Sequence, residues 1–201
     1  MHMLSTLSSP GSLLAAPFSL KQVSFRTHSD AIGRLRVQAW RNERDIDPVF
    51  FARPSWVEEL DSHAMHWVIM DKEEVVAAAR LSLHTSLADV PYAYLLPPTV
   101  QQPLGKHLVA SLSRMVVSPH YRGHRFSKVL DQVRMAAALA AGATALTGAT
   151  QLVFRQQALI NLGFCTLCEV RNAPERPEWP LYFMVYYASA NRPAVAPPRS
   201  L

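Results

Sequence analysis

Two arginines that lie next to apolar runs are the residues of this 201-residue sequence best suited to chemistry. Arg114 alternates with Leu112 and Val116, so a strand would point its side chain toward an apolar face. A guanidinium in that position needs an acidic partner, or it binds the carboxylate of a substrate. Arg80 follows a second apolar run and has the same two alternatives. We expect structural pairing for one of the two arginines and carboxylate capture for the other.

Acidic partners are available in a segment between these runs and the N-terminal part of the chain. Glu59 and Asp61 lie within residues 45–63, a stretch of prolines, aromatics and acids that has no regular period. Such a segment predicts a partly ordered loop, and loops of this kind often frame a site. The two acids are either solvated or paired with Arg80 and Arg114.

Several other chemistries have no support in the sequence. The eight histidines include no H-E-x-x-H, and His63 and His66 would face opposite ways on a strand, so no metal is expected. No G-x-S-x-G is present, which argues against a serine hydrolase. Cys165 and Cys168 form a C-x-x-C in a predicted strand, where two buried thiols in a reducing cytoplasm are the better interpretation than a redox or metal pair.

The elements that must position these residues follow from periodicity. Strands are predicted at 22–27, 66–70, 75–84, 108–117, 144–147, 165–171 and 182–188, and helices at 29–42, 122–141 and 151–162. Residues 86–106 contain four prolines and predict a long connection. The fold class is therefore mixed α/β (α+β), with a central mixed, largely antiparallel sheet and helices on both faces.

One segment carries a family resemblance. The run Ser113-Arg114-Met115-Val116-Val117-Ser118-Pro119-His120-Tyr121-Arg122-Gly123 places V-x-P-x-Y-R-G between an apolar strand and an amphipathic helix. This resembles the core motif of the GNAT N-acyltransferases, and Leu162-Gly163-Phe164 resembles a second landmark of that family. The resemblance implies that the strand holds the pantetheine arm of an acyl thioester. It also implies that the following turn and helix N-terminus bind its phosphate, as helix N-termini do in general.

The turn departs from the family pattern in a way that bears on the acyl donor. Arg125 and Ser127 stand where the family has small residues, and Leu159 replaces a tyrosine often proposed as the general acid. A bulky side chain at the first position should obstruct close approach of a pyrophosphate to the backbone. This departure argues against coenzyme A as the donor and leaves an acyl carrier protein as the alternative.

A second resemblance suggests that donor. Glu59-Leu60-Asp61, Arg80-Leu81 and Ser113-Arg114-Met115 occur in the order found in acyl-homoserine-lactone synthases, although Ala64 replaces a third acid. The sequence combines features of the GNAT N-acyltransferases and of the acyl-homoserine-lactone synthases. In this it resembles the long-chain N-acyl amino acid synthases, including those from soil environmental DNA that acylate tyrosine. That resemblance implies an acyl carrier protein as partner, acyl-phosphopantetheine or acyl-CoA as co-substrate, no permanently bound cofactor, and an amino acid or other small amine as acceptor.

The resemblance also implies roles for individual residues. Backbone N–H groups of Met115 to Val117 would hold the thioester carbonyl, and a carboxylate would end the path of the amine proton, with Glu59 preferred, Asp61 second and His66 or His84 as alternatives. The expected catalytic residues are Glu59, Asp61, Met115 and Val117, and the expected acceptor-binding residues are Arg80, Ser113, Arg114 and Trp67. The expected donor-binding residues are Val116, Val117, Tyr121, Arg122, Gly123, His124, Arg125, Phe126 and Ser127.

Composition is compatible with this scheme and excludes little. A hydrophobic fraction of 49% and a charged fraction of 17% are typical of a globular protein with one core, and no apolar stretch is long enough to span a membrane. The net charge of +5 is scattered, which favours an acidic protein partner over nucleic acid. Residues 1–21 are expected to form a flexible arm, 22–190 the acyltransferase domain and 191–201 a disordered Pro-rich tail.

Three functions remain open from the sequence. The first is a carrier-protein-dependent N-acyl amino acid synthase in the cytoplasm. The second is a coenzyme-A-dependent acetyltransferase acting on a small amine, an antibiotic or a protein N-terminus. The third is a GNAT-fold module that binds a ligand or partner without catalysis.

Overall fold

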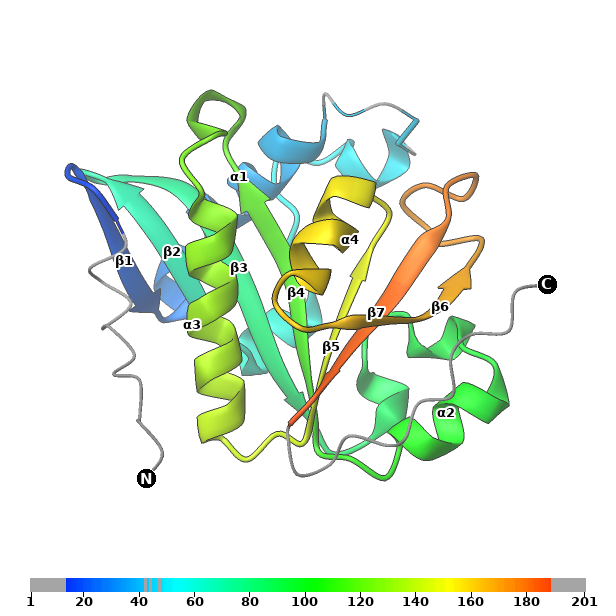
Figure 1. Ribbon diagram of the computed structural model, residues 1–201. Coiled ribbons are helices and arrows are strands. Elements are labelled where there is room, and N and C mark those ends of the chain that lie inside the picture. Colours follow the sequence, from blue (N-terminus) through cyan, green and yellow to red (C-terminus); the bar gives the residue numbers. More distant parts are fainter. Residues whose placement is uncertain (1–13, 42, 44, 47, 189–201) are drawn as a thin grey trace, which may run out of the picture. The chain divides into compact units, whose positions relative to one another are not determined.

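The computed structural model describes residues 14–188 except 42, 44 and 47 (Figure 1). The expected Pro-rich tail and most of the expected arm therefore lie outside the described residues. The chain forms two compact units, the first from residues 1–82 and 112–136 and the second from 83–111 and 137–201. Strands β3 and β4 each run from one unit into the other.

The first unit contains an antiparallel set of strands and two α-helices. Its elements are β1 (Phe18–Val23), α1 (Phe25–Trp40), the 3-10 helices η2 (Pro48–Phe51), η3 (Glu59–His63) and η6 (Pro119–Tyr121), β2 (Met65–Asp71), and most of β3 (Glu74–His84), β4 (Val109–Val117) and α3 (Phe126–Ala140). Helices α1 and α3 lie on opposite faces of the strands (Figure 1). Ile32, Leu35 and Ala39 of α1 pack against Val68 of β2 and Ala78 of β3.

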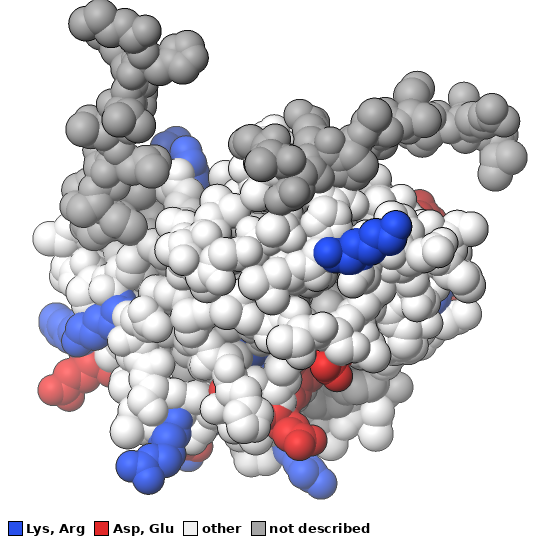
Figure 2. All heavy atoms as spheres, turned by 90° about the horizontal axis from the view of Figure 1, so that it is seen from below, with Lys and Arg blue, Asp and Glu red and all other residues white. Residues whose placement is uncertain are grey.

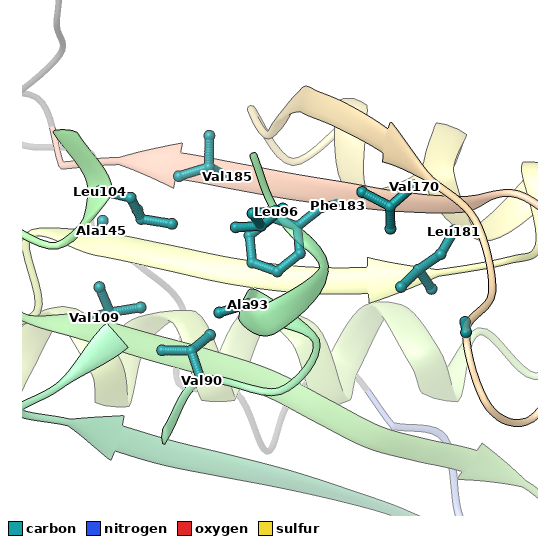
Figure 3. Packing of buried hydrophobic residues seen from close by; sticks show 11 residues of the cluster. Val90, Ala93, Leu96, Leu104, Val109, Ala145, Val170, Leu181, Phe183 and Val185 are labelled. Carbon is teal, nitrogen blue, oxygen red and sulfur yellow. The ribbon is translucent and has the colours of Figure 1, made fainter. Parts of the chain in front are cut away.

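The second unit contains the later strands and a helical connection. Its elements are η4 (Leu87–Asp89), η5 (Ala93–Leu95), α2 (Pro98–Leu104), β5 (Ala145–Thr150), α4 (Val153–Ile160), β6 (Cys165–Val170) and β7 (Leu181–Tyr187). Its core is an apolar cluster with Phe183 of β7 against Leu96 and Ala93 of the connection (Figure 3). The side chains of Leu104, Phe183 and Val185 have no measurable exposure, which is typical of a well-packed core.

The strands are ordered β1-β2-β3-β4-β5-β7-β6 in one seven-stranded sheet. The pairs β1–β2, β2–β3, β5–β7 and β6–β7 are antiparallel, whereas β4 and β5 are parallel. The parallel register joins Val109 with Ala145 through Ser111 with Thr147, and β4 continues from there to Val117. The expected mixed, largely antiparallel sheet with helices on both faces is confirmed.

Two boundaries near the N-terminus differ from expectation. Strand β1 begins at Phe18, so residues 18–21 belong to the sheet rather than to a flexible arm. Helix α1 begins at Phe25 instead of near Ser29, because the Ser24 carbonyl accepts hydrogen bonds from both the amide and the hydroxyl of Thr27. No continuous apolar run marks β1, because this edge strand is only half-buried.

The connection at residues 86–106 is more ordered than its prolines suggested. It contains α2, where Pro98 stands at the start of the helix and needs no hydrogen-bond partner for its nitrogen. Leu104 ends this helix and is fully buried in the apolar cluster. The prolines therefore begin a helix there instead of excluding one.

The two cysteines are free thiols on β6. A register irregularity between Thr166 and Cys168 places both cysteines opposite residues of the same face of β7, Val185 and Phe183. Both are half-buried, and burial raises the pKa of the Cys168 thiol. The expected role as small packing residues agrees with this position, although neither side chain is completely covered.

Candidate active site

Five charged side chains of the first unit form a continuous hydrogen-bonded group, which we call the arginine–carboxylate cluster. Its members are Arg36 of α1, Glu58 and Asp61 at the start of η3, Arg80 of β3 and Arg114 of β4. Three guanidinium groups face two carboxylates, so the cluster as defined carries one positive charge in excess. Its residues come from four separate stretches of the sequence.

The inner end of the cluster is completely buried. Asp61 accepts two hydrogen bonds from Arg36, at 2.7 and 2.8 Å, and one from Arg80 at 2.9 Å. The relative exposure of the three side chains is 0%, 1% and 1%. Asp61 also accepts from the backbone amide of Glu58 at 2.8 Å, which caps η3. This end is suited to holding the loop against the sheet and not to meeting a substrate.

The outer end is partly open. Glu58 is 26% exposed and accepts hydrogen bonds from both Arg80 and Arg114, while Arg114 is 17% exposed. The Arg114 guanidinium also lies over the Trp56 ring, 4.3 Å from its centroid. A partly exposed, rigidly held guanidinium beside a carboxylate can meet a small charged molecule from solution.

The charges of the cluster keep its carboxylates ionised. Burial by itself would raise the pKa of Glu58, but the hydrogen bond and charge of Arg114 and then Arg80 hold it below its usual range. Burial would likewise raise the pKa of Asp61, but Arg36 and Arg80 lower it to about 2. Neither acid is therefore a strong base in this arrangement.

His66 of β2 adjoins the inner end. Its Nε2 lies 3.0 Å from the Asp61 carbonyl and therefore donates to it, and its ring stacks on Phe25. Burial lowers the pKa of His66 more than the nearby carbonyl and charge of Asp61 raise it. The side chain is 1% exposed, so as an alternative base it would have no direct access to a bound molecule.

Strand β4 is irregular where it meets the cluster. Arg114 has a φ of 47°, a left-handed conformation that is uncommon for residues other than glycine and is found at β-bulges. The preceding residue, Ser113, accepts a hydrogen bond from Arg80 Nε at 3.0 Å. After the irregularity, Val116 is buried against α1, and Met115 and Val117 are half-buried. Strained backbone of this kind often occurs at functional sites.

The turn between β4 and α3 keeps a left-handed backbone. Gly123 has a φ of 93° and a Cβ built there would meet nothing within 4 Å, and Arg125 has a φ of 59°. Arg125 therefore adopts the kind of conformation that a glycine would, with its side chain exposed. Helix α3 begins at Phe126, not at Arg122 as expected, because these two left-handed residues delay it.

The remaining turn residues are engaged within the first unit. The Tyr121 hydroxyl donates to Asp71 at 3.0 Å, and the Arg122 guanidinium pairs with Glu43 at 2.7 Å. His124 stacks on Phe126, and both rings contact Phe18 of β1. Ser127 is half-buried in the first turn of α3. The exposed cations Arg125 and Lys128 flank the beginning of this helix.

Some sequence-predicted site residues come together and others do not. Asp61, Arg80, Ser113 and Arg114 meet in the cluster, as the pairing alternative predicted. Glu59 is exposed on η3 and is not part of the cluster. Trp67 precedes Val68 and follows His66 on β2, so it points to the opposite face of the sheet from them and from the cluster.

Two residues of the site were not selected from the sequence. Glu58 takes the place expected for Glu59, and Arg36 supplies the main partner of Asp61. The three-residue spacing of Glu58 and Asp61 is that of a capping box, a signal that could have identified Glu58. Trp56, not Trp67, is the aromatic residue beside Arg114.

A metal centre and a patch of like charges are two other kinds of site that polar side chains could form. Within the described part of the chain, no group of three or more His, Cys, Asp or Glu side chains could hold a metal ion. On the face seen in Figure 2, basic and acidic side chains are interspersed among uncharged ones. No helix among the described residues is long and apolar enough to cross a membrane.

Comparison with known families agrees with the fold and with the motif at the end of β4. Residues 31–132, half of the chain, match the acetyltransferase (GNAT) domain family. The chain belongs to this family. No curated protein sequence matches it.

Solved structures share the fold at low sequence identity. An N-acetyltransferase from Staphylococcus aureus Mu50 is 15% identical with a TM-score of 0.59, over 86% of this chain and 99% of that one. FeeM, an N-acyl amino acid synthase from uncultured soil microbes, is 13% identical with a TM-score of 0.61, over 85% and 90% of the two chains. A Drosophila melanogaster polyamine N-acetyltransferase is 13% identical with a TM-score of 0.61, over 85% and 100%.

Proposed function

We propose that this acyltransferase moves an acyl group, of long chain, from the thioester of an acyl carrier protein to the α-amine of an amino acid. The observation that carries the proposal is the outer end of the arginine–carboxylate cluster, where Arg114 and Glu58 present opposite charges side by side. An amino acid is itself a pair of opposite charges on one carbon. The similarity to FeeM supports the same substrate class.

The charges of the cluster suit this acceptor. Arg114 is the most exposed of its arginines, and its guanidinium can donate to a carboxylate. Glu58 stays ionised and attracts the ammonium group. Trp56 lies against the Arg114 guanidinium and offers a flat surface that an aromatic side chain such as that of tyrosine could contact.

The reaction needs no covalent enzyme intermediate. The neutral amine nitrogen attacks the thioester carbonyl carbon, a tetrahedral oxyanion forms, and the carbon–sulfur bond breaks as the carbonyl reforms. The ammonium loses one proton before attack and the tetrahedral nitrogen loses a second, and the departing thiolate takes up one proton. Backbone N–H groups at Met115 to Val117 are the proposed oxyanion donors.

We also propose a path for the proton that the amine loses. The lowered pKa of Glu58 makes it better at holding an ammonium than at removing a proton, so water passes the proton onward. Glu59, on the exposed side of η3, is the nearest acid in sequence that could end such a path. Asp61 is completely buried and doubly paired, so its role is to position the arginines.

The donor is proposed to dock at the turn before α3. The helix N-terminus and the exposed cations Arg125 and Lys128 attract the phosphate of phosphopantetheine and the acidic surface of a carrier protein. The free cysteines suit a reducing cytoplasm, where carrier-bound thioesters are made.

The first experiment is expression in a bacterial host, followed by extraction of the medium and mass spectrometry. Long-chain N-acyl amino acids should appear that an empty-vector culture lacks, and the product mass identifies the amine. An Arg114→Lys variant should lose most of the product, because an ammonium cannot maintain the two-point contact of a guanidinium. Arg34→Ala, at an exposed ion pair of α1, is the matched control and should keep it.

A second candidate function follows from the conformation of the turn. Gly123 and Arg125 both have left-handed backbones, so the turn retains a shape that could bind the pyrophosphate of coenzyme A. Two of the similar structures named above are acetyltransferases. Calorimetry with acetyl-CoA separates the candidates: micromolar binding together with an empty medium extract would replace the carrier-protein proposal with this one.

A further inference from the structure

A second buried ion pair of the first unit lies on the other face of the sheet from the arginine–carboxylate cluster. Arg134 and Asp131 of α3 are 0% and 1% exposed, and their side chains meet at 2.6 Å. Both residues lie on the buried side of α3, where apolar side chains would be expected. Buried pairs of this kind cost desolvation free energy and are weak evidence for stability alone, so they call for a specific role.

The contacts of Arg134 indicate that role. Its Nη1 donates to the backbone carbonyl of Arg80 at 3.0 Å and to that of Ser113 at 3.2 Å. These are the same two residues whose side chains join in the cluster, where Arg80 Nε donates to the Ser113 hydroxyl. Arg134 therefore holds the backbone of Arg80 and Ser113 from the α3 face of the sheet. The side chains of these two residues contribute to the site on the α1 face.

The geometry of β4 explains why two strand carbonyls accept from a side chain. Carbonyls within a sheet usually accept from amides of the adjacent strand. Ser113 directly precedes Arg114, whose φ of 47° interrupts the regular strand. A left-handed residue turns the adjoining peptide group out of the regular strand direction, and a guanidinium with several donors in a fixed plane can hold the Ser113 carbonyl together with that of Arg80 on β3.

Asp131 and the helix fix the guanidinium in turn. Arg134 Nη2 donates to Asp131, and Arg134 Nε donates to the Leu130 carbonyl one turn earlier in α3 at 3.1 Å. With Nε, Nη1 and Nη2 all engaged, the side chain has one well-defined orientation. A displacement of α3 would consequently move the carbonyls of Arg80 and Ser113.

We propose that Arg134 is a positioning residue for acyl transfer: through the Arg80 and Ser113 carbonyls it holds the β4 irregularity and so orients Arg114 and Glu58 toward the acceptor. The kinetic part of this inference rests on the proposed function. It assigns to a residue of α3 an effect on acceptor binding, although the residue lies behind the sheet and does not touch the acceptor.

Kinetics of Arg134→Lys test the proposal against a control that only weakens the core. A lysine keeps the charge beside Asp131 but cannot reach two carbonyls and the carboxylate together. We expect the KM for the amino acid to rise about tenfold, comparable to loss of one charged hydrogen bond, with the KM for the acyl donor changed less than about twofold. Val129→Ala, in the same buried stripe of α3, should lower the Tm without changing either KM.

Two results would overturn the inference. One is an acceptor KM for Arg134→Lys within about twofold of the unaltered protein, and the other is an equal rise in Val129→Ala. A purified unaltered protein that acylates no amino acid would instead contradict the proposed function.

Hydrogen exchange tests whether Arg134 supports the backbone of β3 and β4. This test does not depend on which reaction the protein catalyses. Amides at 80–82 and 113–115 should exchange about tenfold faster in Arg134→Lys than in Val129→Ala, since the strand irregularity loses its support. Equal exchange in the two variants would show that Arg134 does not hold this backbone.

Discussion

The two units bury different kinds of side chain. The second unit packs an apolar cluster around Phe183, Leu96 and Leu104, with no charge in it (Figure 3). The first unit also has an apolar cluster beneath α1, but next to it lie Arg36, Asp61 and Arg80, all at most 1% exposed. The second unit also buries Glu175 and Arg176, but these lie outside its apolar cluster, whereas in the first unit a network of charges adjoins the apolar cluster.

The difference indicates where function has constrained the molecule. Apolar side chains of suitable volume are enough to fold a core, and many combinations satisfy that need. Buried charges require particular partners in particular directions, and hydrophobic replacements are often equally stable. The charged network leads outward to the partly exposed Glu58 and Arg114, which is consistent with the proposed role of its buried end in orienting its open end.

Removing the central acid of the network should have the largest effect. Asp61→Ala leaves Arg36 and Arg80 without their shared partner, and we expect a loss of about 3–5 kcal/mol in the free energy of unfolding. Urea denaturation measures it. The exposed pair of Asp30 with Arg34 is the control, and Asp30→Ala should cost no more than about 0.5 kcal/mol. Similar losses in both variants would remove the distinction between buried and surface charge.

A cavity in the second unit should affect stability without affecting acceptor binding. Leu104→Ala removes a fully buried side chain from the apolar cluster, and we expect a loss of about 2–5 kcal/mol. The KM for the amino acid, measured on the folded fraction, should stay unchanged. A raised acceptor KM would mean that the apolar cluster also shapes the site.

We expect the stability of the first unit to fall at acidic pH, because Asp61 then takes up a proton. Arg36 and Arg80 hold its pKa at about 2 in the folded protein, below the usual range of an aspartate. The unfolded chain therefore binds the proton more readily, so this contribution is complete above about pH 4 and is lost as pH falls toward 2. The contribution is at most about 2 kcal/mol. Unfolding measured across this range should show a shallower pH dependence in Asp61→Asn, and an unchanged slope would contradict the assignment.

The open end of the network should matter least to stability and most to the acceptor. Glu58→Gln removes one charge at a half-exposed site, and we expect a loss of about 1–2 kcal/mol. The KM for the amino acid should rise about tenfold as the ammonium loses its partner. Steady-state kinetics with varied amino acid measures this effect, and Glu59→Gln is the matched control for a neighbouring acid. A larger effect from Glu59→Gln would return the proton-accepting role to Glu59.

Much of the fold was predictable because long elements have clear periods. The hairpin of β2 and β3, the strand β4 and the helix α3 alternate or repeat apolar residues strongly enough to be recognised locally. The half-buried edge strand β1 and the proline-containing helix α2 lack such patterns. Their positions depend on pairing with β2 and on burial of Leu104, which are tertiary effects.

The candidate site was predictable in kind and less so in its members. A buried arginine on an apolar strand requires an acid or a substrate carboxylate, which predicted structural pairing for one of Arg80 and Arg114, and the structure pairs both with Glu58. The choice between Glu58 and Glu59 depended on how one turn of 3-10 helix faces the sheet, since adjacent residues there point in different directions. Trp67 lies on the face of β2 away from the cluster, because neighbouring residues of a strand face opposite sides, whereas Trp56, from the irregular segment before η3, lies beside Arg114.

The sequence by itself determined the family, the order of the main strands and helices, and the presence of arginines that needed acidic partners. Each follows from local composition and spacing. Tertiary structure alone decided that Arg36, Asp61 and Arg80 share one network, that Glu58 meets Arg114, and that Arg134 supports them from the other face. These contacts join residues 19 to 56 positions apart, and the direction of a charged side chain over such separations is set by packing, not by its neighbours in the chain.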